Sequence, residues 1–174
     1  MQLAIAELER ADFPIIRGWI DPKIFPIFHP PITDEQLERL LTRREDGRLT
    51  DLGLKAVDVD AGSPVGLVHV VLNWENEYAH IQQILVGSPE LQRQGIGSAL
   101  MRNVLEVLFD QHGFHRVQLF VDEDNVAAFD FYRKHGFQVD GFMRESRKVG
   151  DEFEGWYCLS MLDREWCEIG LNRR

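Results

Sequence analysis

Apolar and polar positions along the chain recur with two different periods. In GIGSALMRNVLEVLFDQHG the apolar residues are spaced by one helical turn, and Gly113 stands where such a helix would end. The segment QLAIAEL near the N-terminus instead alternates apolar and polar residues, which is typical of a strand with one buried face. The chain therefore mixes helices and strands.

The same two periods predict the remaining elements. Short helices are expected in ADFPIIRGWI, TDEQLERLLTRR and NVAAFDFYRKHG, the last with Asn125 as its N-cap. Strands are expected in LGLKAVDVD, VGLVHVVLNW, AHIQQILVG and RVQLFV, and two antiparallel strands flank the turn VGDEFEG. The order β-α-α-β-β-β-α-β-α-β-β predicts one α/β domain of the α+β kind, with a mixed sheet flanked by helices.

Composition narrows the class of protein. Of 174 residues, 44% are hydrophobic and 28% are charged, as in ordinary globular domains. The sequence has no run of roughly 18 apolar residues that would span a bilayer, and its acidic start is unlike a secretory signal, so we expect a cytoplasmic protein without a membrane partner. The net charge of −10 disfavours a nucleic-acid partner and suits a cationic small substrate. The two cysteines and six histidines form no metal-ligand pattern in the sequence, so no metal cofactor is expected.

The stretch ELQRQGIGSAL places Gly95 and Gly97 at a junction between a strand and a helix. Free N–H groups and the helix dipole suit an anion there, and small residues let a phosphate approach the main chain. Leu100 stands where a dinucleotide fingerprint needs a small residue, and no lysine follows either glycine as a P-loop requires. The two glycines alone fit a diphosphate site of another class or a plain connecting loop.

A second group of residues lies on the next predicted helix. Asn125, Phe129 and Tyr132 are spaced i, i+4 and i+7, so they share one helix face. Their amide and phenol groups can meet one ligand, or they can serve as a helix cap and a residue at the edge of the core.

Together the two segments resemble the GNAT family of N-acetyltransferases. The acetyl-CoA signature of that family, Gln/Arg-x-x-Gly-x-Gly/Ala, is present at residues 92–97, with Pro89 three residues before it. The later signature, Asn-x-x-Ala-x-x-x-Tyr-x-x-x-Gly-Phe, is present in order and spacing at Asn125, Ala128, Tyr132, Gly136 and Phe137. The resemblance covers about residues 52–161 and implies a mostly antiparallel sheet with a splayed strand pair that binds CoA. It implies one domain over residues 1–174, with an acceptor-side region over 1–51 and a C-terminal tail over 162–174.

The resemblance also implies a role for each motif. The main chain of Leu85, Val86 and Gly87 would pair with the pantetheine arm of acetyl-CoA, and Asn125 would contact the same arm. Tyr132 would be the general acid that protonates the leaving thiolate, because a phenol with an ordinary pKa of about 10 stays protonated at neutral pH. The N–H near Val86 would polarise the thioester carbonyl for direct attack by an amine. The residues implied to hold the CoA diphosphate are Gln92, Arg93, Gln94, Gly95, Ile96, Gly97 and Ser98.

The group that removes the proton of the acceptor amine stays open. Some family members carry a glutamate in the strand before the Asn motif, where this chain has Phe120. Glu77 and His80 near the start of the cofactor strand, and Asp122 and Glu123 further on, are candidates that would act through water. A separate departure is a glycine at position 87, where the family usually has valine, and it predicts a gap or added flexibility beside the pantetheine.

The acceptor is expected to meet the N-terminal helices and the final hairpin, roughly residues 19–41 and 144–156. Phe25, Phe28 and His29 are candidate walls of its pocket, or ordinary core residues. The acceptor favoured is a small-molecule amine or a peptide or protein N-terminus. The sequence leaves the oligomeric state open, with a homodimer as one alternative because dimers are common in the family. The alternative to an enzyme is a domain that binds acetyl-CoA without catalysis, as a sensor or interaction module.

Overall fold

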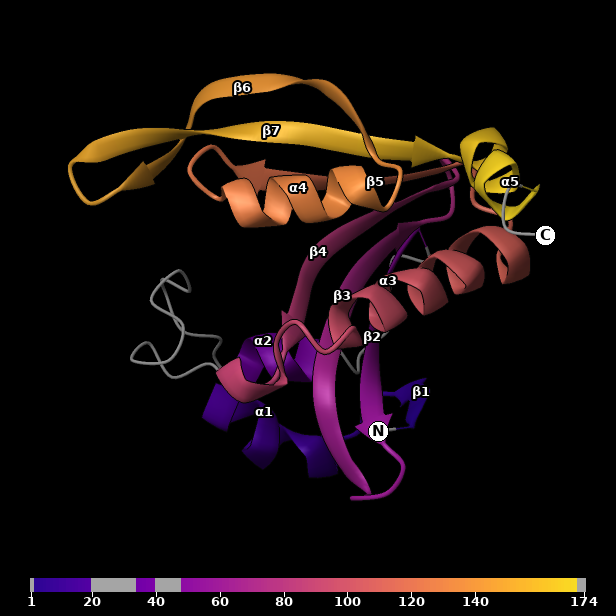
Figure 1. Cartoon of the computed structure of the whole chain (residues 1–174). Coiled ribbons are helices and arrows are strands. Elements are labelled where there is room, and N and C mark those ends of the chain that lie inside the picture. Colours follow the sequence, from indigo (N-terminus) through magenta and orange to yellow (C-terminus); the bar gives the residue numbers. More distant parts are fainter. Residues whose placement is uncertain (1, 20–33, 40–47, 172–174) are drawn as a thin grey trace.

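The computed structural model describes residues 2–19, 34–39 and 48–171. In this part of the chain seven strands form one sheet in the order β1-β2-β3-β4-β5-β7-β6, and only β4 and β5 run parallel. The predicted mixed, mostly antiparallel sheet flanked by helices is confirmed (Figure 1). The strands are β1 (Leu3–Glu7), β2 (Leu49–Asp58), β3 (Ser63–Asn73), β4 (Tyr78–Val86), β5 (Arg116–Asp122), β6 (Gln138–Val149) and β7 (Glu152–Leu162).

Successive side chains along each strand point to opposite faces of the sheet. Both faces therefore present side chains that helices cover. The larger buried cluster joins one face to α3 and α4, and a smaller cluster joins the other face to α1 and α2. We call these the α3 face and the α1 face. The helices are α1 (Phe13–Trp19), α2 (Asp34–Arg39), α3 (Ile96–Leu105), α4 (Val126–Lys134) and α5 (Asp163–Leu171), with 3-10 turns at Arg10–Asp12 and Pro89–Leu91.

The helix predicted after the glycine-containing stretch is confirmed. It begins at Ile96, and beyond Leu105 it continues as a π-helical segment, Glu106–Gln111. Its apolar stripe is fully buried at Leu100, Met101 and Val104, which is why the 3.6-residue period was readable.

A buried ion pair anchors the N-terminal segment to the sheet. Lys55 Nζ on β2 lies 2.7 Å from Asp12 Oδ2, and the two side chains are 11% and 9% exposed. The same Asp12 oxygen accepts a hydrogen bond from the Glu9 N–H at 2.8 Å. Breaking one partner of such a pair would leave a buried charge uncompensated.

The segment expected as a C-terminal tail forms helix α5. The Trp166 indole stacks on Phe109 with ring centroids 5.9 Å apart, and its Nε1 donates to Asp110 Oδ1 at 2.9 Å. Ile169 lies against Gly136, where a Cβ would come within 2.5 Å of its side chain. This helix therefore contacts both the end of the α3 helix and the segment that follows α4.

Candidate functional site

The two halves of the sheet separate between β4 and β5. These strands pair only from Tyr78 with Arg116 to Ile81 with Leu119, although β4 continues to Val86 and β5 to Asp122. Figure 1 shows β2, β3 and β4 running away from β5 and β7, with the starts of α3 and α4 beside the opening. The predicted splayed pair is therefore present in the fold.

The end of β4 offers main-chain groups to this opening. Val86 is opposite Gly66 on β3, and the Gly87 N–H donates to Val65 O at 2.8 Å. In an antiparallel ladder this pattern marks Val86 and Gly66 as a non-hydrogen-bonded pair, so the N–H and C=O of Val86 point away from β3. The main-chain groups of Leu85 point toward β3. Of the three residues predicted to pair with pantetheine, Val86 is the one whose main chain faces the opening.

The loop before α3 has the backbone of an anion-binding turn. Arg93 and Gly95 both have left-handed backbones, with φ of 61° and 84°. No side chain in the described part of the chain caps the Gly95 end of α3, and no acidic residue lies in its first turn. The first N–H groups of the helix thus remain open, with the positive end of the helix dipole behind them. Successive N–H groups of this kind form concave sites that bind phosphates.

Gly97 marks the point where three elements meet. A Cβ added there would lie 3.6 Å from both the Phe131 ring on α4 and the Val86 side chain on β4. These are ordinary contact distances, so the start of α3 lies directly against the open end of β4. The signature at residues 92–97 and the strand edge at Val86 therefore belong to one site.

Tyr132 lies on the α3 face and is 8% exposed. Its ring packs edge-on against Phe131 and Phe137, with centroids 5.4 and 5.9 Å apart. Burial raises the pKa of Tyr132 to about 12, because the ionised phenolate would lose its hydration. The hydroxyl therefore keeps its proton at neutral pH. Its predicted role as general acid stays a prediction.

Asn125 is the N-cap of α4, as predicted, and its Oδ1 accepts from the Ala128 N–H at 3.1 Å. This bond satisfies one of the open donors at the helix start. The capping bond uses one lone pair of the carbonyl oxygen, so the second lone pair and the amino group of Asn125 are left for a ligand.

The expected gap beside Gly87 is filled, so that prediction is wrong. The indole of Trp19 lies against this glycine, and a Cβ at position 87 would come within 2.5 Å of Trp19 Cε2. Trp19 is the last residue of α1 and belongs to the buried cluster of the α1 face together with Leu85. A large side chain from α1 therefore occupies the space beside Gly87.

Aromatic residues line the α1 face just where β4 and β5 separate. Phe120 is the first β5 residue after the pairing ends and is 40% exposed. Its ring meets the His80 ring at 4.7 Å and stacks on Trp156 of β7 at 5.6 Å with an angle of 13°. An exposed phenylalanine between two rings is a candidate surface for a ligand. In RVQLFV, Phe120 occupies the same alternating positions as Arg116 and Gln118. The sequence could therefore have indicated that the Phe120 side chain faces outward.

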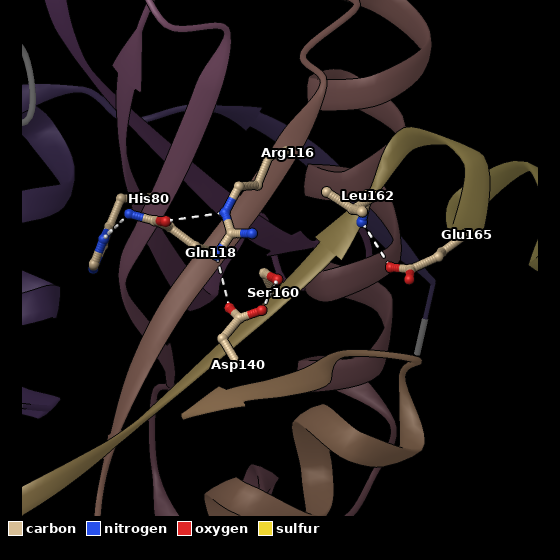
Figure 2. Close-up of polar contacts among 7 residues, drawn as sticks. All are labelled: His80, Arg116, Gln118, Asp140, Ser160, Leu162 and Glu165. Carbon is tan, nitrogen blue, oxygen red and sulfur yellow. Dashed lines mark hydrogen bonds and ion pairs between the residues drawn. The ribbon is translucent and has the colours of Figure 1, made fainter. Parts of the chain in front are cut away.

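A chain of polar side chains continues from His80 across the same face (Figure 2). Gln118 Nε2 lies 3.4 Å from His80 Nδ1, and Arg116 Nε donates to Gln118 Oε1 at 3.2 Å. Arg116 Nη2 donates to Asp140 Oδ2 at 2.7 Å, and Asp140 Oδ1 accepts from Ser160 Oγ at 2.9 Å. Of these residues only His80 could be singled out from the sequence, because nothing local in the sequence reveals which strands pair.

The other candidate bases lie in different surroundings. Glu77 is in the turn before β4, at the end of that strand opposite to the opening, so the geometry leaves it outside the site. Asp122 Oδ1 accepts from Trp156 Nε1 at 2.7 Å and lies 3.1 Å from Arg147 Nη2. Glu123 Oε1 accepts from the Gly155 N–H at 2.9 Å. The candidate acceptor walls Phe25, Phe28 and His29 lie outside the described residues.

Within residues 2–19, 34–39 and 48–171 no group of three or more His, Cys, Asp or Glu side chains could hold a metal ion. No helix in the same ranges is long and apolar enough to cross a membrane. These two observations describe only that part of the chain.

Comparisons with known proteins identify one family. Residues 4–137 match the model of the Acetyltransferase (GNAT) family. An uncharacterized N-acetyltransferase of Methanocaldococcus jannaschii is 33% identical over 97 residues, which is 51% of this chain and 42% of that protein. Spermidine N(1)-acetyltransferase of Escherichia coli is 33% identical over 81 residues, covering 46% of this chain and 42% of that protein. The chain thus matches less than half the length of these curated relatives.

The fold also matches solved structures. The crystal structure of spermidine N-acetyltransferase from Vibrio cholerae in complex with CoA and spermine has a TM-score of 0.80 and is 23% identical. The match covers 95% of this chain and 98% of that one. At this identity the likeness establishes a common fold.

Proposed function

This chain belongs to the acetyltransferase (GNAT) family, and we propose that it transfers the acetyl group of acetyl-CoA to a primary amine of a small molecule or of a peptide or protein N-terminus. One observation carries the proposal: the Val86 N–H faces the opening between β4 and β5, beside the uncapped start of α3. An edge that offers strand-like hydrogen bonds and a helix start that attracts an anion together match an arm-shaped ligand ending in phosphates.

The residues around the start of α3 fit a diphosphate. Gly95 has a left-handed backbone, and the space that its Cβ would take is open, so a ligand can approach the main chain. Position 92 is glutamine, a neutral residue, so we assign most of the binding of charge to main-chain N–H groups of residues 93–98. We assign the pantetheine arm to the free edge of β4 at Val86, with Asn125 on its other side.

Bound acetyl-CoA supplies an activated carbonyl and a thiolate leaving group. Val86 contributes an N–H donor to the carbonyl oxygen, and removing one such donor typically costs roughly 10²–10³ in rate. Tyr132 holds a proton at neutral pH because its phenolate is disfavoured by burial. It is therefore the group that we assign to protonating the thiolate.

The proposal is tested by measuring thiol release from acetyl-CoA over a panel of amines, together with acetyl-CoA binding by calorimetry. We expect Tyr132→Phe to lower kcat by roughly 10²–10⁴ while the Kd for acetyl-CoA stays within about twofold, because a general acid acts in the transition state. Tyr78→Phe is the matched control, since Tyr78 lies at the closed end of β4.

Two results would oppose the proposal in different ways. Unchanged kcat in Tyr132→Phe at saturating amine would remove the general-acid role. Tight acetyl-CoA binding without turnover on any amine would favour the alternative, a domain that binds acetyl-CoA as a sensor or interaction module.

A further inference from the structure

The polar chain on the α1 face fixes the orientation of the Gln118 amide. A guanidinium carries only donors, so the group of Gln118 that faces Arg116 Nε at 3.2 Å must be its carbonyl oxygen. Arg116 is itself held by Asp140 at 2.7 Å. The amino group of Gln118 must then face His80, as Figure 2 shows.

That orientation determines which ring nitrogen of His80 carries the hydrogen. The Gln118 amino group can only donate, so His80 Nδ1, 3.4 Å away, must present its lone pair. A neutral imidazole with an unprotonated Nδ1 has its hydrogen on Nε2. Burial, together with the neighbouring His69, lowers the pKa of His80 and keeps the ring neutral. His69 in turn lies 2.8 Å from Asp51 Oδ1.

His80 lies at the edge of the opening. It precedes Ile81, the last β4 residue that pairs with β5, and its ring contacts exposed Phe120. In the described part of the chain His80 Nε2 makes no hydrogen bond, so its N–H is available to a ligand on the α1 face. Leu119 and Phe120 are neighbours on β5, so their side chains point to opposite faces of the sheet. The buried Leu119 belongs with Tyr132 to the cluster of the α3 face, so Tyr132 lies on the face opposite to Phe120.

We propose that the Nε2–H of His80 donates a hydrogen bond to an oxygen of the acceptor, which makes the acceptor an amine with a carbonyl or carboxylate oxygen close to it. Free amino acids and the first residue of a peptide have this chemistry. The proposal rests on the proposed function, and in it Gln118 is a positioning residue that acts through His80.

The charges around His80 point to the same class of acceptor. A protonated polyamine offers only N–H donors, which an Nε2–H donor cannot bind. The nearby carboxylates are engaged: Asp140 binds Arg116 and Ser160, and Asp122 binds Trp156 and Arg147. In this proposal the lone pair on Nδ1 is turned to Gln118, so His80 acts as a hydrogen-bond donor to the acceptor and not as the base for the amine.

The tautomer is tested directly by long-range ¹H–¹⁵N correlation spectra of the imidazole nitrogens in the full chain. We expect the neutral Nε2–H form for His80 at neutral pH, and a mixture of tautomers in Gln118→Leu. A neutral Nδ1–H form or an imidazolium in the unsubstituted chain would overturn the proposal, whether or not any His80 variant folds.

The acceptor class is tested with leucinamide and isopentylamine, which differ in the carboxamide. Leucine and the dipeptide leucyl-glycine separate a free amino acid from a peptide, and spermidine represents acceptors without oxygen. We expect His80→Phe to lower kcat/KM about tenfold for leucinamide and at most about twofold for isopentylamine, because one hydrogen bond is lost. His112→Phe is the control, since His112 contacts Trp74 away from the opening. Each acceptor is compared with itself between variants, so differences in pKa among the amines do not affect the comparison.

The outcomes separate the two proposals. Equal effects of His80→Phe on leucinamide and isopentylamine, or a clear preference of the unsubstituted chain for spermidine, would overturn this inference and leave acetyl transfer standing. Absence of turnover with every amine would instead overturn the proposed function.

Discussion

Replacing Gly87 with alanine would place a methyl group against the ring of Trp19. The new Cβ would lie 2.5 Å from Trp19 Cε2 and 2.8 Å from its Nε1, whereas carbon atoms in contact need about 3.5 Å. The missing distance, about 1 Å by the same comparison, must come from moving an indole that is 8% exposed. Trp19 packs with Ile16 and Leu67, so it has little room to move.

The magnitude follows from two opposing effects. Overpacking a core by a methyl group costs about 1–3 kcal/mol, and alanine restricts the unfolded chain by about 0.4–1 kcal/mol relative to glycine. Gly87 does not have a left-handed backbone, so no strain is added. We expect Gly87→Ala to lower the free energy of unfolding by about 1–2 kcal/mol.

Urea unfolding of a double-mutant cycle with Trp19→Phe measures this effect. The smaller ring makes room for the methyl group, so Gly87→Ala should cost at least about 1 kcal/mol less in the Trp19→Phe background. Gly97→Ala is the matched control, because its Cβ would make only ordinary contacts at 3.6 Å. Equal costs of Gly87→Ala in both backgrounds, or an equal cost of Gly97→Ala, would refute the reasoning.

Three further predictions use other parts of the molecule. Gly95→Ala should cost about 1–2 kcal/mol at its φ of 84° and weaken acetyl-CoA binding, as measured by calorimetry; unchanged affinity would contradict the assigned phosphate site. Because burial raises the pKa of Tyr132 to about 12, the unfolded chain loses this proton first, and stability should fall above about pH 10 by up to roughly 1.4 kcal/mol per pH unit; urea unfolding of Tyr132→Phe should lack this contribution. Asp12→Ala should lower the free energy of unfolding by up to about 3–5 kcal/mol, because the carboxylate left beside Lys55 Nζ, that of Glu9 at 3.7 Å, is largely exposed; adding Lys55→Met should recover most of the loss, and urea unfolding that shows no recovery would contradict this.

The sequence predicts those features whose cause is local. The helix starting at Ile96 and the cap at Asn125 follow from short-range patterns, and both are present. The hairpin around the turn VGDEFEG was equally readable, because its two strands are adjacent in the chain. The motif at residues 92–97 and the helix face that carries Tyr132 are also short-range patterns, so they indicate the site from the sequence alone.

The features that the sequence does not predict depend on contacts between distant segments. Trp19 and Gly87 are separated by 68 positions in the sequence. The absent side chain of Gly87 therefore suggests a gap, and only the fold shows that the Trp19 ring fills it. The bonds from Arg116 to Asp140 and from Gln118 to His80 require knowing that β5 lies between β4 and β7. Helix α5 was expected only as a tail, and its position depends on long-range contacts such as that of Trp166 with Phe109.

Helix α5 connects the two half-sheets at the end where β4 and β5 pair. The two half-sheets are joined by hydrogen bonds only over the four residue pairs of β4 and β5. At that same end α5 holds the helix following α3 through Trp166 and the segment after α4 through Ile169. We therefore expect contacts at the closed end to contribute to the width of the opening. Substitutions of Trp166 or Ile169 in the last helix would then alter the opening from a distance.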